Sequence, residues 1–203
     1  MTTAMREDSP MSTDTPLLSW FRRVVVVMGN TAEQTHPPAV QQRAWYAAGA
    51  SGYASERAEW PALDVPATRH LTMLERPDPT TTGIDALVRD LLDLSPTLPW
   101  RPSARAGDEG ASVALVDLFE CLEMPAAGAG VMLLGPGACY PEHAHAPEEL
   151  YLLLRGNRRW RFGGSCEYAP TSPGQVLSNS ANDLHGVEAG DDVMLAVWVL
   201  VDG

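Results

Sequence analysis

The first hundred residues carry apolar positions at three- and four-residue steps. Such steps predict an amphipathic helix from Pro16 to Met28, although the four consecutive valines within it leave a strand open. The run AVQQRAWYAAGA after Pro37-Pro38 predicts a second helix, because proline is favoured in the first helical turn. The segment IDALVRDLLDL predicts a third helix, with one apolar face made by Ile84, Leu87, Leu91 and Leu92. This part of the chain is therefore mainly helical.

The pattern changes after Arg105. Short apolar or alternating runs follow one another, separated by glycine, proline, asparagine and aspartate: SVALVDLFE, MLLGPGACY, ELYLLLRG, RRWRFGG, TSPGQVLSNS and VMLAVWVLV. Their spacing of about ten residues is typical of an all-β sandwich or barrel. We therefore predict a mainly β protein with a disordered tail over 1–15, a helical extension over 16–104 and a β domain over 105–203.

Composition and charge narrow the partners. A chain of 203 residues is long enough for one well-buried core. Its formal net charge of −12 argues against nucleic acid or an anionic membrane, because binding to phosphates needs clustered basic residues. No export signal is recognisable, no apolar run approaches the roughly 20 residues of a membrane span, and the cysteines show no CxxC spacing. We expect a cytoplasmic monomer or homodimer that acts on a small molecule.

One stretch combines residue types that carry chemistry: GACYPEHAHAPEELYLLLRG, residues 137–156. His143, His145 and Glu149 within it are of the types that bind divalent first-row metals. On a strand, residues of equal parity point to one face, so the two histidines would project together, as would Glu149 and Tyr151. A further imidazole from a neighbouring strand would complete a metal site with open positions, and His185 is the histidine available downstream.

These residues resemble a known superfamily. The spacing around the histidines matches the first signature motif of the cupins: Gly137-x5-His143-x-His145-x3-Glu149-x6-Gly156. Pro173, Gly174 and His185 resemble the second cupin motif, with a longer gap between the glycine and the histidine. The resemblance implies a double-stranded β-helix barrel in the C-terminal half, with one divalent metal in its mouth. The ligands would suit Fe, Mn, Zn, Ni or Co, and they would be His143, His145, Glu149 and His185.

A narrower resemblance points to the dimethylsulfoniopropionate (DMSP) lyase cupins. It rests on residues 140–151, on Trp160, on the AspLeuHis that ends at His185 and on LeuAlaValTrp at 195–198. Those enzymes also carry helices before the barrel. The chain departs from them at Ala144, where they often have another histidine, and in the glycine and valine that follow His185.

What this resemblance implies is a metal-dependent β-elimination that cleaves DMSP to acrylate and dimethyl sulfide. Tyr151 matches the family's catalytic tyrosine and would act as general base. The metal must then favour its phenolate, since a free phenol has a pKa of about 10. Tyr140 matches a second family tyrosine and would assist or replace it. Trp198 and Tyr140 are candidates to hold the sulfonium cation on their aromatic faces.

Other interpretations stay open from the residues alone. The same ligands would serve a cupin dioxygenase or isomerase acting on another small acid or sugar, or a non-catalytic cupin that binds a small molecule. Tyr151 and Trp198 would then be packing residues of apolar strands. The one basic cluster is expected to meet the acidic surface, with binding of a substrate carboxylate by one of its members as the alternative; it consists of Arg155, Arg158, Arg159 and Arg161.

Overall fold

Three helices occupy the first part of the chain. The computed structural model describes residues 14–61, 65–106, 112–124, 128–162 and 169–201, so most of the predicted tail over 1–15 lies outside the described residues. The helices are α1 (Pro16–Thr35), α2 (Pro38–Ser51) and α3 (Gly83–Leu94), with the 3₁₀ helices η1 (Pro66–Met73) before α3 in the chain and η2 (Ser95–Thr97) directly after it. All three predicted helices are confirmed. Within the described ranges, no helix is both long and apolar enough to cross a membrane.

The valine run of α1 follows the helical period. Val24 and Val25 are fully buried, whereas Val26 is 45% exposed. Thr15 caps the helix, because its side-chain oxygen accepts a hydrogen bond from the Leu18 backbone N–H at 3.3 Å. The cap and the buried stripe together explain why these β-branched residues form a helix, and the strand alternative is wrong here.

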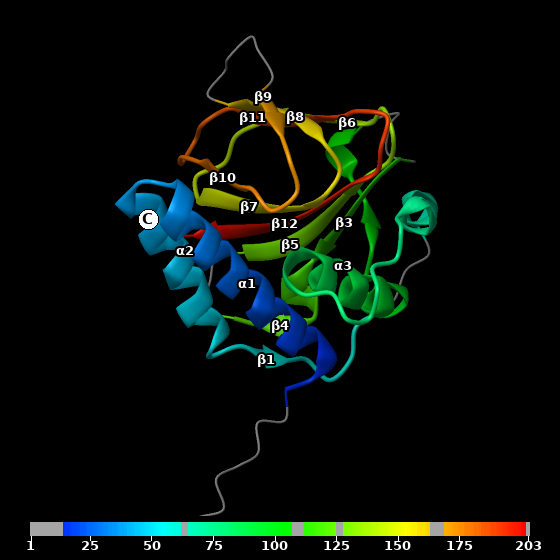
Figure 1. The fold of residues 1–203 in the computed structure, drawn as a ribbon, viewed down its shortest axis with the longest axis horizontal. Helices are drawn as coiled ribbons and strands as arrows, with labels where there is room; N and C mark the ends of the chain where they lie inside the picture. Colours follow the sequence, from blue (N-terminus) through cyan, green and yellow to red (C-terminus); the bar gives the residue numbers. More distant parts are fainter. Residues whose placement is uncertain (1–13, 62–64, 107–111, 125–127, 163–168, 202–203) are drawn as a thin grey trace, which may run out of the picture.

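Two sheets and a short strand pair make up the rest (Figure 1). The larger sheet has the order β10–β7–β12–β5–β3–β2, the smaller one β6–β11–β8–β9, and β1 pairs with β4. Each of these pairings is antiparallel. The strands are β1 (Ser55–Glu56), β2 (Arg101–Pro102), β3 (Val113–Asp117), β4 (Leu122–Glu123), β5 (Gly128–Leu134), β6 (Cys139–His143), β7 (Glu148–Arg155), β8 (Arg158–Phe162), β9 (Ala169–Thr171), β10 (Val176–Asn179), β11 (His185–Ala189) and β12 (Met194–Val201).

Side chains of the larger sheet alternate between two apolar cores. On β7, Leu150, Leu152 and Leu154 pack in the core that contains the helices, while Tyr151 and Leu153 belong to a second core shared with the smaller sheet. The helices therefore cover one face of the larger sheet, and the smaller sheet covers the other. Because both faces are buried, the central strands read as continuous apolar runs instead of alternating ones.

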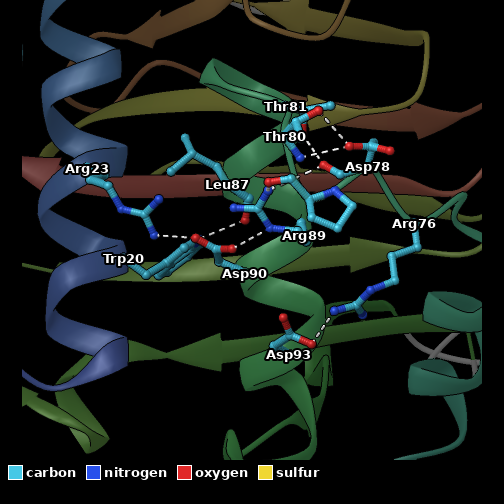
Figure 2. Close-up of polar contacts among 11 residues, drawn as sticks. Trp20, Arg23, Arg76, Asp78, Thr80, Thr81, Leu87, Arg89, Asp90 and Asp93 are labelled. Carbon is cyan, nitrogen blue, oxygen red and sulfur yellow. Dashed lines mark hydrogen bonds and ion pairs between the residues drawn. The ribbon is translucent and has the colours of Figure 1, made fainter.

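Polar contacts join α3 to α1 within the helical layer (Figure 2). The Trp20 indole N–H donates to the Leu87 carbonyl at 2.9 Å inside the core. Arg23 of α1 pairs with Asp90 of α3 at 2.5 Å, and Arg89 holds the same carboxylate at 2.9 Å. The buried indole thus keeps a partner and avoids the cost of an unsatisfied donor.

The strands of three or more residues overlap the predicted runs except at β11, and the two-residue strands β1, β2 and β4 also lie outside those runs. Strand β11 was not predicted, because its five residues include Gly186 and Glu188 and form no apolar run. The protein is mainly β with helices, as predicted. Within the described ranges, strand pairing leaves the two sheets as separate ladders. The predicted boundary at residue 105 stays a prediction, and β2 joins the larger sheet just before it.

Candidate metal centre and active site

A β-bulge in β6 brings two aromatic rings onto one face. β11 pairs with β6 at His185–His143 and again at Val187–Tyr140, so two steps along β11 oppose three along β6. Regular alternation would place Tyr140 and His143 on opposite faces. The extra residue reverses the alternation, and the two ring centroids lie 5.0 Å apart. Tyr140 therefore lies beside the histidines although its parity differs from theirs.

Three imidazoles meet where β6 and β11 lie side by side. One nitrogen from each lies within 4.8 Å of the other two. The ring centroids of His143 and His185 are 4.3 Å apart, and those of His145 and His185 are 5.1 Å apart. His143 is the last residue of β6, whereas His145 lies beyond the strand end. The expected strand alternation therefore does not explain His145, which reaches the cluster from the turn before β7.

Each imidazole turns its Nδ1 toward a backbone carbonyl two residues away. The three nitrogen-to-oxygen pairs are His143 to Pro141 (3.1 Å), His145 to Pro147 (2.9 Å) and His185 to Asp183 (2.8 Å). Since a carbonyl oxygen only accepts, each Nδ1 carries a proton and donates it. The Nε2 lone pairs are left to bind a cation, as in histidines that hold a metal.

Glu149 joins the imidazoles from β7. Its Oε2 lies 3.0 Å from His185 Nε2 and 3.3 Å from His145 Nε2, and the residue is 4% exposed. His185 Nε2 is buried, and when the ring proton is on Nδ1 this nitrogen has none to donate to Glu149. With neutral imidazoles, lone pairs of nitrogen and carboxylate would face one another in a site of low polarity. A proton or a metal cation between them removes this repulsion.

Burial and these contacts set the charges of the group. Burial acts to raise the pKa of Glu149, but His145 and His185 outweigh it and lower that pKa to about 2. Burial lowers the pKa of the His143 imidazole to about 4, whereas Glu149 raises the pKa of His145. The carboxylate is therefore ionised and His143 is neutral near pH 7, which are the forms that bind metals.

Asn179 and Tyr151 surround the carboxylate. The buried Asn179 donates from Nδ2 to Glu149 Oε2 at 3.3 Å. Tyr151 follows Glu149 by two residues on the same face of β7 and is 2% exposed, with its ring 4.6 Å from the Trp160 ring. Burial and, after it, the Glu149 charge raise the pKa of Tyr151 well above its usual value. The protein groups alone thus favour the phenol, and a nearby cation would favour the phenolate.

Trp198 pairs with Tyr151 across the ladder, on the face of β12 that points toward the smaller sheet. A Cβ at the neighbouring Gly130 would come within 2.2 Å of the Trp198 ring and of the Val116 carbonyl oxygen. The indole therefore occupies space that a glycine leaves open. Tyr140, Tyr151 and Trp198 all contribute to the apolar cluster between the two sheets.

The basic cluster meets acidic side chains, as expected. The ion pairs of its described side chains are Arg155–Asp85, Arg159–Glu188 and Arg161–Glu142. Sequence reasoning missed a different arginine, Arg105, whose positive charge acts on His143, His145 and Tyr151. An isolated arginine between the helical and β patterns carries no signal for such a role, because only the fold places it beside the cluster.

Comparison with known proteins gives the family. The sequence profile of the dimethylsulfoniopropionate lyase family matches residues 48–196. The chain belongs to this family. It is a carbon–sulfur lyase of the DMSP-cleaving type, so the predicted activity is confirmed at this level. No curated protein matches the chain in sequence.

Two solved structures share the fold. A structure of the DMSP lyases RdDddP and RnDddQII is 21% identical, with a TM-score of 0.69, over 93% of this chain and 93% of that chain. The DMSP lyase DddQ from Ruegeria pomeroyi DSS-3 is 19% identical, with a TM-score of 0.68, over 90% of this chain and 91% of that chain. Since the matches cover nearly the whole chain, the helices belong to the shared fold together with the sheets.

Proposed function

We propose that this DMSP lyase carries out its elimination at the imidazole cluster, with His143, His145, Glu149 and His185 holding one divalent metal. The observation that carries the proposal is the convergence of Nε2 lone pairs on the buried Glu149 carboxylate, with the Nδ1 protons donated elsewhere. This donor set of nitrogens and one carboxylate fits Fe, Mn, Zn, Ni or Co. When bound, the metal supplies Lewis-acid stabilisation of negative charge on the substrate carboxylate.

The reaction needs a base beside the carbon that carries the carboxylate. The base removes a proton from this carbon, the freed electron pair forms the double bond of acrylate, and the carbon–sulfur bond breaks with its electrons on sulfur. Dimethyl sulfide thus departs as a neutral molecule, and the proton stays on the base. No oxidant or second substrate is required, so proton removal is the step that the protein must assist.

Tyr151 is the base that we propose, and Tyr140 is the second candidate. Tyr151 lies on the strand face of Glu149, within the buried cluster between the sheets. Burial and the Glu149 charge raise the pKa of its phenol, so a cation bound nearby would have to lower this pKa before the phenolate could act as the base. Tyr140 approaches from the other sheet and contacts His143 edge-on. Trp198 and Tyr140 would offer aromatic faces to the sulfonium cation.

Several broader features belong to the same proposal. The two facing sheets would form the cupin barrel over residues 105–203, with 16–104 as the helical extension. The buried and free Cys121 agrees with a cytoplasmic, reducing location. The assembly would be a monomer or a homodimer, and the partner a small-molecule substrate.

The direct test measures dimethyl sulfide above purified protein given DMSP. The protein is first stripped with a chelator and then loaded in turn with Fe, Mn, Zn, Ni or Co. We expect dimethyl sulfide and acrylate in equal amounts with at least one metal and none after chelation. Full metal loading without release of either product would overturn the proposal.

A further inference from the structure

An ion pair crosses the strand that carries His185. Arg161 of β8 donates from Nε to Glu142 Oε1 at 2.5 Å, and its Nη2 donates to the other carboxylate oxygen of the same residue. β8 and β6 do not pair with each other, because β11 lies between them. The two side chains therefore span β11 from one neighbouring strand to the other. A bidentate pair of this kind fixes orientation as well as distance.

Gly186 makes this crossing possible. It pairs with Arg161 in the ladder and directly follows His185. A Cβ added at Gly186 would come within 3.2 Å of the Glu142 Cγ and of the Tyr140 carbonyl oxygen. The Glu142 side chain thus lies close over the glycine. A larger residue at this position would push the carboxylate away from Arg161.

Glu142 also lies inside the β6 bulge. The register shift falls between Tyr140 and His143, and Glu142 is one of the two residues between them. Its carboxylate is therefore attached to the segment whose extra residue turns both rings inward. A bulge interrupts ladder hydrogen bonds, so side-chain contacts must help to hold its geometry.

We propose that the Glu142–Arg161 pair is a positioning device that holds the β6 bulge against β8 and thereby keeps Tyr140 and His143 oriented toward the metal centre. The inference rests on the proposed metal ligands. The effect of Glu142 and Arg161 is transmitted through the backbone of the bulge, as for other groups that orient metal ligands from outside.

A second ion pair within the smaller sheet provides a matched control. Arg159 of β8 pairs with Glu188 of β11 at 3.4 Å, with side chains 63% and 43% exposed. The Arg161 and Glu142 side chains are only 25% and 24% exposed. The control pair lies beyond the bulge, and Glu188 faces Cys139 on β6. Removing it tests the general effect of an arginine–glutamate pair on the smaller sheet.

The test compares Arg161→Gln and Glu142→Gln with Arg159→Gln. Each variant is loaded with Co(II), and the visible spectrum, the Co(II) affinity and kcat for dimethyl sulfide release are measured together with the midpoint of thermal unfolding. We expect Arg161→Gln and Glu142→Gln to shift the Co(II) spectrum and to lose about 10-fold in Co(II) affinity. Losses of this size are typical when a residue that orients a metal ligand without binding the metal is removed. We expect kcat to fall while KM changes little, and Arg159→Gln to resemble the unaltered protein.

The double variant Glu142→Gln/Arg161→Gln completes the test. If the pair acts as one unit, its Co(II) affinity should equal that of either single variant. The inference would be overturned if Arg161→Gln and Glu142→Gln had the same Co(II) spectrum and Co(II) affinity as Arg159→Gln. This holds even if the parent protein is an active DMSP lyase. If the parent protein releases no dimethyl sulfide while Arg161→Gln and Glu142→Gln still shift the Co(II) spectrum, the proposed function would be overturned and the positioning role supported.

Discussion

At the residue scale, the site depends on which atom of each side chain points inward. Three backbone carbonyls accept hydrogen bonds from the Nδ1–H groups of the histidines, so the Nε2 lone pairs remain free to bind a cation. The motif spacing predicted which residues gather, but it carries no information on their tautomers. These follow from local turns, since each carbonyl belongs to the residue two positions before or after its histidine.

Glu149 offers the first prediction at this scale. Glu149→Gln removes the charge but keeps the shape, so the variant should fold while its metal affinity falls by more than the roughly 10- to 100-fold typical of outer groups. The measurement is metal content after dialysis, together with a Co(II) titration. Glu148→Gln is the control, because Glu148 pairs with Arg43 instead of the imidazoles. Equal metal affinity in the two variants would show that Glu149 is not a ligand.

The choice of base gives a second residue-scale prediction. Tyr151→Phe keeps the ring packed on Trp160 and removes only the hydroxyl, so metal binding should survive while kcat falls by about 10²- to 10⁴-fold. Tyr140→Phe is measured in parallel under the same metal loading. A larger loss in Tyr140→Phe than in Tyr151→Phe would reassign the base to Tyr140.

At the element scale, local pattern was enough for most helices and strands but not for the site's geometry. The apolar steps predicted α1, α2 and α3, and the short runs predicted the long strands. The β6 bulge and strand β11 escaped, because a bulge is a property of two paired strands and β11 gains its apolar surroundings only from its neighbours. Tyr140 was predicted as a site residue from the family resemblance, whereas regular strand alternation would have placed its side chain on the face opposite the histidines.

Packing of β5 against β12 yields a prediction of its own. In Gly130→Ala the new methyl group would lie 2.2 Å from both the Trp198 ring and a carbonyl oxygen, so the strands must shift. We expect a loss of about 1–3 kcal/mol in unfolding free energy, as in other overpacked cores. Gly49→Ala is the control, because open space surrounds that helical position and alanine favours helix by about 1 kcal/mol. Denaturant unfolding of both variants measures the difference, and a Gly130→Ala protein as stable as its parent would contradict this packing.

At the scale of the whole molecule, one large sheet separates two cores with different tasks. The helices and the face of the larger sheet that they cover form an apolar core, in which strand residues such as Leu152 and Val197 are fully buried. The other face contributes Glu149 and Tyr151 from β7, and the smaller sheet opposite it contributes Tyr140, His143 and His185. Sequence alone could indicate that both faces are apolar, but the face on which each strand carries its chemistry depends on register between strands distant in the chain.

Acid sensitivity of the folded protein links these levels in a last prediction. The pKa of His143 is about 4 when folded and about 6.5 when unfolded, so only the unfolded chain takes up this proton between those values. Glu149 acts in the same direction at lower pH. Its contribution to folding stability is complete above pH 4.5 and is lost as the pH falls through about 2. His145, whose pKa is raised, partly offsets the loss.

Chelated protein should therefore show a midpoint of thermal unfolding that declines from pH 6.5 to pH 4. His143→Gln should flatten this decline, and excess Co(II) should raise the midpoint most near pH 7, where proton competition is weakest. An equal decline in His143→Gln and in the parent would show that His143 is not the group responsible.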